Sequence, residues 1–148
     1  MSEHINLIVN KSHALLGEIK IPGDKSISHR SIILGSIAAG NLTIENFLDS
    51  DDCMNTVLAM KQLGANITVK DQRVSIFGKG LFSLKKPKKT INVGNSGTLI
   101  RLLSGVLAAQ DFTSSLTGDS SLRSRPMERI LEPLKNIGAE IDSNGFKA

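Results

Sequence analysis

An internal repeat limits the folds open to this 148-residue chain more than any other feature of its sequence. Residues 23–39 resemble residues 94–110, and residues 57–67 resemble residues 131–141, in the same order along the chain. Similar segments that recur in order are typical of a repeated structural unit. The sequence therefore predicts two copies of one supersecondary unit.

The first unit alternates strand and helix patterns. Short alternating segments predict strands, and apolar residues that recur every three to four positions predict helices. The last two strands form a hairpin that turns at Asp71 and Gln72. The first helix is expected to end near Gly40 and to be largely buried through Ile27, Ile33, Leu34, Ile37 and Ala38. The other predicted elements are strands at 17–21, 43–47, 66–70 and 73–77 and a second helix at 51–63.

The second unit repeats this order but stops early. Its first helix is expected to end near Gln110 and to bury Leu99, Leu103, Val106 and Leu107. The fold class is therefore mixed α/β (α+β), with about two βαβαββ units, and the missing last strand suggests a fragment because an unpaired edge exposes backbone groups. The elements predicted here are strands at 90–93, 112–117 and 139–142, a helix at 126–137 and a turn at 143–145.

Composition narrows the class of protein. Hydrophobic residues make up 40% of the chain, as in a globular domain, and no apolar run approaches the ~20 residues of a membrane helix. The formal net charge of +4 favours an anionic partner, and five Phe with no Trp or Tyr provide few stacking platforms for unpaired bases. Small anions are therefore expected, and neither nucleic acid nor membrane. The lone Cys53 and the absence of a signal-peptide pattern predict a cytoplasmic location.

Small polar residues stand where the first helix of each unit begins. The first unit has Gly23-Asp24-Lys25-Ser26 there, and the second has Gly94-Asn95-Ser96-Gly97-Thr98. Helix N-termini attract anions through free N–H groups and the positive end of the dipole. Arg30 and Arg101 each follow one turn later, and helical side chains lean toward the N-terminus. The pattern predicts two anion sites in which each arginine reaches back to the anion.

A further basic cluster covers residues 121–127, where the first unit instead carries Asp49, Asp51 and Asp52. This asymmetry indicates a specialised second unit, with Arg125 completing a strongly cationic pocket. The candidate site residues from this pattern are Lys25, Arg30, Arg101 and Arg125.

Other features carry simpler interpretations. A single Gly-rich start would be an ordinary helix cap, and the lysines of residues 85–89 are typical of an exposed loop. We expect His29 to be a polar or partly buried spacer and Cys53 to be a core residue. Three scattered His and one Cys give no zinc spacing, and no nucleotide-binding loop is complete, so neither a metal nor a cofactor is expected.

Three motifs together resemble the 5-enolpyruvylshikimate-3-phosphate (EPSP) synthase family: GDKSISHR, GNSGTLIRLLSG and LTGDSSLRSRPM, at residues 23–30, 94–105 and 116–127. The resemblance implies an inside-out α/β barrel of βαβαββ units, of which this chain is similar to the N-terminal third. Residues 1–20 would then pair with a second domain, and residues 21–148 would form part of the N-terminal domain. The two repeats would cover about 21–85 and 90–148.

The resemblance also implies an activity: transfer of the enolpyruvyl group from phosphoenolpyruvate to the 5-hydroxyl of shikimate 3-phosphate, with release of phosphate. Family members are usually monomeric, and their acid and base residues lie outside the part that this chain resembles, so the chain alone would be inactive. The resemblance also implies roles by position. Lys25 would be catalytic and would bridge both substrates. Shikimate 3-phosphate would be held by Lys25, Ser26 and Arg30, phosphoenolpyruvate would be received by Lys25, Gly97 and Arg125, and the wall of the site would be lined by Asn95, Thr98 and Arg101.

Three alternatives stay open on the sequence alone. A UDP-N-acetylglucosamine enolpyruvyl transferase would share the fold but lacks the pattern of GDKSISHR. A basic nucleic-acid-binding module would bind oligonucleotides with strong salt dependence. A noncatalytic fragment or fusion part is the third alternative.

Overall fold

The computed structural model describes residues 7–11 and 13–143. Its larger sheet contains three antiparallel strands in the order β1 (Ala39–Ile44), β3 (Arg73–Lys79) and β2 (Asn66–Lys70). In the register, Ala39 lies opposite Lys79, and Lys70 lies opposite Arg73. The β2–β3 hairpin turns at Asp71, whose φ is 52°, which confirms the hairpin predicted from the sequence.

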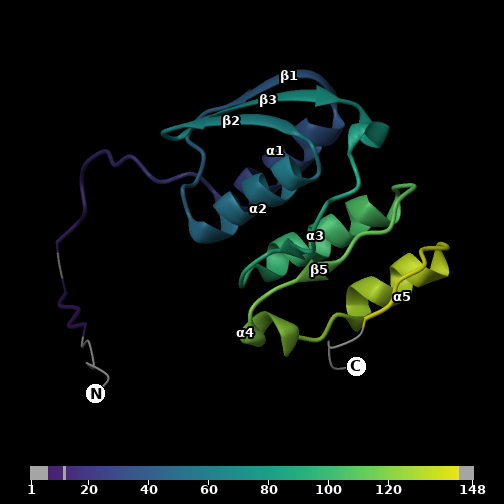
Figure 1. Ribbon diagram of the computed structural model, residues 1–148. Helices are drawn as coiled ribbons and strands as arrows, with labels where there is room; N and C mark the ends of the chain where they lie inside the picture. Colours follow the sequence, from purple (N-terminus) through teal and green to yellow (C-terminus); the bar gives the residue numbers. More distant parts are fainter. Residues whose placement is uncertain (1–6, 12, 144–148) are drawn as a thin grey trace.

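Two helices cover one face of this sheet, namely α1 (Lys25–Ile37) and α2 (Asp51–Gln62) (Figure 1). Residues of β3 alternate between buried and exposed, as expected for a sheet with one covered face. Gly78 of β3 lies directly against the carbonyl oxygens of Gly35 and Ala38, where a Cβ would collide with both. The end of α1 therefore rests on β3 backbone to backbone.

The second half of the chain is built around one long helix. Strand β4 (Ile91–Asn92) pairs in parallel with β5 (Leu116–Thr117), and α3 (Gly97–Ala108) connects them. The short helix η1 (Leu81–Ser83) leads from β3 toward β4. Helices α4 (Ser120–Arg123) and α5 (Glu128–Asn136) follow β5, and α5 lies beside α3 (Figure 1).

One hydrophobic core joins the two halves. It includes Met60 of α2, Leu63 directly after α2, and Leu99 and Leu103 of α3, all fully buried. The burial predicted for Leu99, Leu103 and Leu107 is confirmed, and Val106 is partly buried. The described part of the chain contains no helix long and apolar enough to cross a membrane.

The buried face of α1 differs from the prediction. Ile27 and Leu34 are 58% and 57% exposed, whereas His29 and Ile32 are fully buried. Ala38 is also exposed, although Ile33 is buried as expected. The side of α1 that meets α2 and the sheet carries Ser28, His29, Ile32, Ile33, Gly35 and Ser36. The polar side chain of His29 can occupy this side because Thr56 on α2 provides a hydrogen-bond partner for its Nδ1.

Several predicted strands are wrong in extent or existence. Residues 17–21 form no strand, because they are exposed and lie away from both sheets, where no neighbour supplies ladder hydrogen bonds (Figure 1). The strand predicted at 43–47 begins and ends earlier, since Asn46 has a φ of 54° and turns the chain so that Phe47 enters the core. The strand predicted at 112–117 is limited to the two residues that pair with β4.

The end of the chain also differs from the prediction. The helix predicted at 126–137 begins at Glu128, because Asp119 caps a separate short helix, α4, just before it. Residues 139–142 form no strand, since no strand of the described chain pairs with them. The turn predicted at 143–145 falls mostly outside the described residues.

Candidate functional site

The first turns of three helices meet at a pocket of about 410 Å³. Lys25 comes from α1, Asp52 from α2, and Gly97 and Thr98 from α3. Because each helix carries partial positive charge at its N-terminus, three such ends at one pocket favour an anion. The remaining lining residues are Asn95, Arg101 and Arg125.

The α1 side of the pocket pairs its cation with a carboxylate. The side chain of Asp24 caps α1 by accepting a hydrogen bond from Ile27 N at 2.7 Å, which places Lys25 in the first turn. Lys25 Nζ forms an ion pair with the Asp52 carboxylate, and the two side chains are 50% and 24% exposed. Asp52 is not among the site residues predicted from the sequence, although its position in the first turn of the predicted second helix is a signal for it.

A buried hydrogen bond joins α1 to α2 beneath this ion pair. His29 Nδ1 lies 2.6 Å from Thr56 Oγ1, and Thr56 Oγ1 donates to the carbonyl oxygen of Asp52 at 3.3 Å. Burial lowers the pKa of His29; the charge of Asp52 opposes this shift and that of Lys25 adds to it. His29 is fully buried rather than partly buried, and it does not line the pocket. Because its pKa is lowered, its imidazole is neutral at pH 7.

Cys53 is also buried next to this contact, as predicted for a core residue. Its N–H donates to Ser50 Oγ, the cap of α2, at 3.4 Å. Burial raises the pKa of the Cys53 thiol, which opposes formation of a reactive thiolate.

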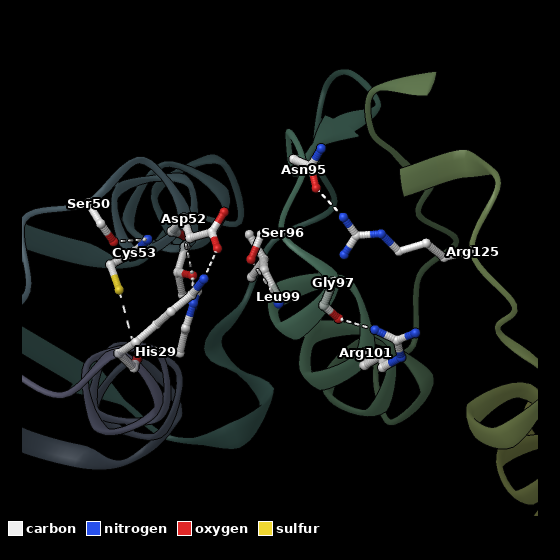
Figure 2. Close-up of polar contacts among 12 residues, drawn as sticks. His29, Ser50, Asp52, Cys53, Asn95, Ser96, Gly97, Leu99, Arg101 and Arg125 are labelled. Atoms are coloured by element: carbon white, nitrogen blue, oxygen red, sulfur yellow. Dashed lines mark hydrogen bonds and ion pairs between the residues drawn. The ribbon is translucent and has the colours of Figure 1, made fainter. Parts of the chain in front are cut away.

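The α3 side presents backbone amides and two guanidinium groups. Ser96 Oγ caps α3 by accepting from Leu99 N at 3.2 Å, which leaves the N–H groups of Gly97 and Thr98 without an acceptor inside the helix. A Cβ on Gly97 would lie 2.8 Å from Nη1 of both Arg101 and Arg125. Figure 2 shows both guanidinium groups beside Gly97, so glycine keeps this space open.

Arg101 reaches back one turn, as the sequence predicts, but its partners are backbone carbonyls. Nη1 donates to Gly97 O at 3.0 Å (Figure 2), and Nη2 donates to Pro126 O at 3.3 Å. The guanidinium therefore also ties α3 to the segment between α4 and α5.

Arg125 is held by a chain of side chains. Its Nη2 donates to Asn95 Oδ1, Asn95 Nδ2 donates to Asp119 Oδ2 at 2.7 Å, and Figure 2 shows the bond between Asn95 and Arg125. Asp119 Oδ1 accepts from Leu122 N at 2.7 Å. The hydrogen bond from Leu122 N lowers the pKa of Asp119. The hydrogen bond from Asn95 and the positive charge of Arg125 lower it further.

The pocket has an excess of positive charge. Its lining contains three cations, Lys25, Arg101 and Arg125, and one carboxylate, that of Asp52. This charge, the free amides of α3 and the fork geometry of guanidinium suit a phosphate or carboxylate group. The part of the chain that the structure describes contains no group of three or more His, Cys, Asp or Glu side chains that could hold a metal ion.

The structure brings together most of the residues proposed from the sequence, but in one pocket rather than two. Lys25, Asn95, Gly97, Thr98, Arg101 and Arg125 all line it. Ser26 and Arg30 are exposed on α1 outside this lining, so their proposed role stays a prediction. Asp119, which is not among the predicted site residues, accepts a hydrogen bond from Asn95.

Fold and pocket together define a mixed α/β protein with a cationic pocket. The family model of EPSP synthase (3-phosphoshikimate 1-carboxyvinyltransferase) matches residues 9–148, and the chain belongs to this family. The match covers all three motifs from which the resemblance was drawn.

Individual relatives agree with the family model. The chain is 50% identical over 141 residues to 3-phosphoshikimate 1-carboxyvinyltransferase of Herpetosiphon aurantiacus, covering 93% of this chain and 33% of that protein. It is 50% identical over 133 residues to the Bacillus subtilis (strain 168) protein of the same name, covering 90% and 31%. The solved EPSP synthase from Acinetobacter baumannii superimposes with a TM-score of 0.82 at 45% identity, covering 88% of this chain and 31% of that one. The chain thus spans about a third of the length of these relatives.

Proposed function

We propose that this chain takes part in transfer of the enolpyruvyl group from phosphoenolpyruvate to the 5-hydroxyl of shikimate 3-phosphate, with release of phosphate. The observation that carries this proposal is the pocket that Lys25 of α1 lines together with Arg101 and Arg125, beside the first turn of α3. Both proposed substrates are anionic and must bind next to each other, so the site needs several cations close together. Membership of the family supports the assignment.

Within this proposal, phosphoenolpyruvate lies against the α3 side of the pocket. Gly97 leaves room for it, the amides of Gly97 and Thr98 face it, and Arg125 pairs with it. Asn95 and Arg101 complete the wall. Lys25 stands opposite and is placed to contact both substrates, whereas Ser26 and Arg30 extend the site along α1 toward shikimate 3-phosphate.

The reaction adds the 5-hydroxyl O–H across the double bond of phosphoenolpyruvate, with the oxygen going to the carbon that carries the phosphate and a proton to the methylene carbon. The tetrahedral intermediate then eliminates phosphate as the new methyl group loses a proton, which restores the double bond. Lys25, Arg101 and Arg125 contribute by orienting two anions and by offsetting their mutual repulsion. The one carboxylate in the pocket, Asp52, is paired with Lys25. This pairing leaves no carboxylate of the pocket lining free to act as an acid or a base. We therefore expect the isolated 148-residue chain to bind substrate without turning it over.

The sequence repeat belongs to the same proposal. We infer that residues 21–85 and 90–148 are two βαβαββ units of an inside-out α/β barrel, and that residues 1–20 pair with a second domain. The exposed apolar side chains of Leu15, Leu16 and Ile19, each more than 80% exposed, support such a partner for the first segment.

Titration calorimetry of this chain with shikimate 3-phosphate tests the assignment, alongside a phosphate-release assay with phosphoenolpyruvate. We expect saturable binding that is lost in Arg30→Ala and no phosphate release. Arg73→Ala is the matched control, because Arg73 lies on β3 and pairs with Glu45 at 3.0 Å, away from the pocket. No binding by a chain that circular dichroism shows to be folded would contradict the proposal for this chain, and turnover would contradict the expected lack of activity.

The salt dependence of binding separates this proposal from a nucleic-acid-binding module. Such a module would bind oligonucleotides with an affinity that falls steeply as salt rises. The proposed enzyme would prefer shikimate 3-phosphate over an oligonucleotide at any salt concentration.

A further inference from the structure

Asp119 makes hydrogen bonds toward both the pocket and α4, where its backbone carbonyl oxygen accepts from Arg123 N at 3.0 Å. Its N–H donates to Gly94 O at 3.0 Å, its Oδ1 accepts from Leu122 N at 2.7 Å, and its Oδ2 accepts from Asn95 Nδ2 at 2.7 Å. It does not itself line the pocket. An ordinary helix cap needs only the bond from Leu122, so the bond to Asn95 requires a separate explanation.

The chemistry of the three side chains allows one arrangement of the Asn95 amide. A carboxylate only accepts hydrogen bonds, a guanidinium only donates them, and an amide has one end of each kind. With Asp119 on its NH2 group, Asn95 must turn its carbonyl oxygen toward Arg125, where it accepts from Nη2. The reversed amide would place donors against Arg125 and an acceptor against Asp119.

The amide also separates two opposite charges. A carboxylate in direct contact with Arg125 would orient it but would cancel much of its charge, as Asp52 does for Lys25. With Asn95 between them, Arg125 is fixed by a neutral oxygen. Arg101 is likewise held by neutral carbonyl oxygens, of Gly97 and Pro126, so both guanidinium groups keep their charge for a ligand.

We propose that Asp119 is a positioning residue of the anion pocket: through Asn95 it holds Arg125 in place without neutralising it. This inference rests on the proposed function, in which Arg125 receives the anion phosphoenolpyruvate. It predicts that a change at Asp119 is felt at the Asn95 amide and at Arg125, although the ligand never touches Asp119.

The test compares Asp119→Asn and Asp119→Ser with the unaltered chain. Both variants keep a side-chain oxygen that can cap α4. Asparagine has a single oxygen, so when it caps Leu122 N it presents its NH2 group to Asn95, and serine is too short to reach Asn95. Asp71→Asn is the charge-matched control, because Asp71 lies at the tip of the β2–β3 hairpin, away from the pocket.

Two measurements are made on each folded variant. The first is the affinity for phosphoenolpyruvate by titration calorimetry, which we expect to fall about 10-fold in both Asp119 variants and to be unchanged in Asp71→Asn. The second is the NMR spectrum of the Asn95 side-chain amide and the Arg125 guanidinium. Both signals are expected to shift in the Asp119 variants without any ligand present. In an Asn95→Ala background, Asp119→Asn should have little further effect on affinity, because the connection is already lost.

The two measurements fail in different ways. If the unaltered chain does not bind phosphoenolpyruvate, the proposed function fails for this chain, and the NMR signals alone decide the role of Asp119. If the Asn95 and Arg125 signals do not move in folded Asp119→Asn and Asp119→Ser, the inference is overturned. Unchanged affinity in both variants, with binding intact in the unaltered chain, also overturns it, as does full additivity with Asn95→Ala.

Discussion

The two sides of the pocket hold their cations in different ways. On the α1 side, Lys25 is paired directly with the carboxylate of Asp52. On the α3 side, Arg125 meets the neutral oxygen of Asn95, and the carboxylate of Asp119 lies one residue further back. A direct ion pair fixes a side chain at the expense of its charge, whereas an amide between the charges fixes it and preserves the charge. The α3 side is therefore the stronger anion receptor when no ligand is bound.

Removing the guanidinium of Arg125 should have the largest effect. We expect Arg125→Ala to weaken binding of phosphoenolpyruvate about 100-fold, because a charge-assisted bidentate contact is lost. Titration calorimetry measures the change. Arg123→Ala is the control, since Arg123 is exposed at the end of α4 and does not line the pocket. Equal losses in the two variants would contradict a specific role for Arg125.

A side chain at Gly97 should have the next largest effect. In Gly97→Ala the new Cβ would lie 2.8 Å from Nη1 of Arg101 and of Arg125, so both guanidinium groups must move away. We expect binding of phosphoenolpyruvate to weaken about 10-fold with little change in thermal stability, because the groups that move are the ends of flexible side chains. Gly105→Ala is the control, since a Cβ there meets nothing within 4 Å. Unchanged affinity in Gly97→Ala would show that the ligand does not approach this point.

Asp52→Asn tests the comparison most directly, because it should act in the opposite direction to Asp119→Asn. Both substitutions remove one negative charge near the pocket. Loss of the carboxylate at Asp52 frees the charge of Lys25, so we expect affinity for phosphoenolpyruvate to rise about 3-fold at low salt and less at high salt. Titration at two ionic strengths measures this. A decrease in affinity would mean that Asp52 is needed mainly to orient Lys25.

A change in pH should produce the smallest effect and should act on the α1–α2 contact. Burial lowers the pKa of His29 below its ordinary value of 6.5, so the unfolded chain binds a proton more readily than the folded one. The folded state keeps its full stability with respect to His29 above pH 6.5, where the imidazole is neutral in both the folded and the unfolded chain. That stability is lost as the pH falls from 6.5 toward the lowered pKa of His29 in the folded chain. We expect the melting temperature to decrease over this range by calorimetry. In His29→Gln, which keeps a partner for Thr56 without a titrating group, this part of the pH dependence should disappear.

Local features of the fold could be predicted from the sequence because they depend on neighbouring residues. The hairpin at Asp71 and the apolar periodicity of α3 follow from local backbone chemistry and from the residues near each position. Elements that depend on distant partners were less predictable. Residues 17–21 have the pattern of a strand but no partner in the described chain.

The candidate site shows the same division. Lys25, Arg30, Arg101 and Arg125 could be selected from the pattern because cations stand at or near expected helix starts, whereas Gly97 was selected through the resemblance to the family. Asp119 could not, since an aspartate before a short unpredicted helix looks like any cap. The burial of His29 could not be predicted either, because it depends on Thr56, 27 residues away.

The sequence by itself determined the chemistry available at each helix start, namely which cations, glycines and caps stand there. Only the tertiary structure decided that the starts of α1, α2 and α3 meet, so that two expected anion sites form one pocket. It also decided which carboxylate neutralises Lys25 and which amide separates Asp119 from Arg125. The physical reason is that caps and helical periodicity act over a few residues, whereas charge pairing and burial depend on which surfaces the shared core brings together.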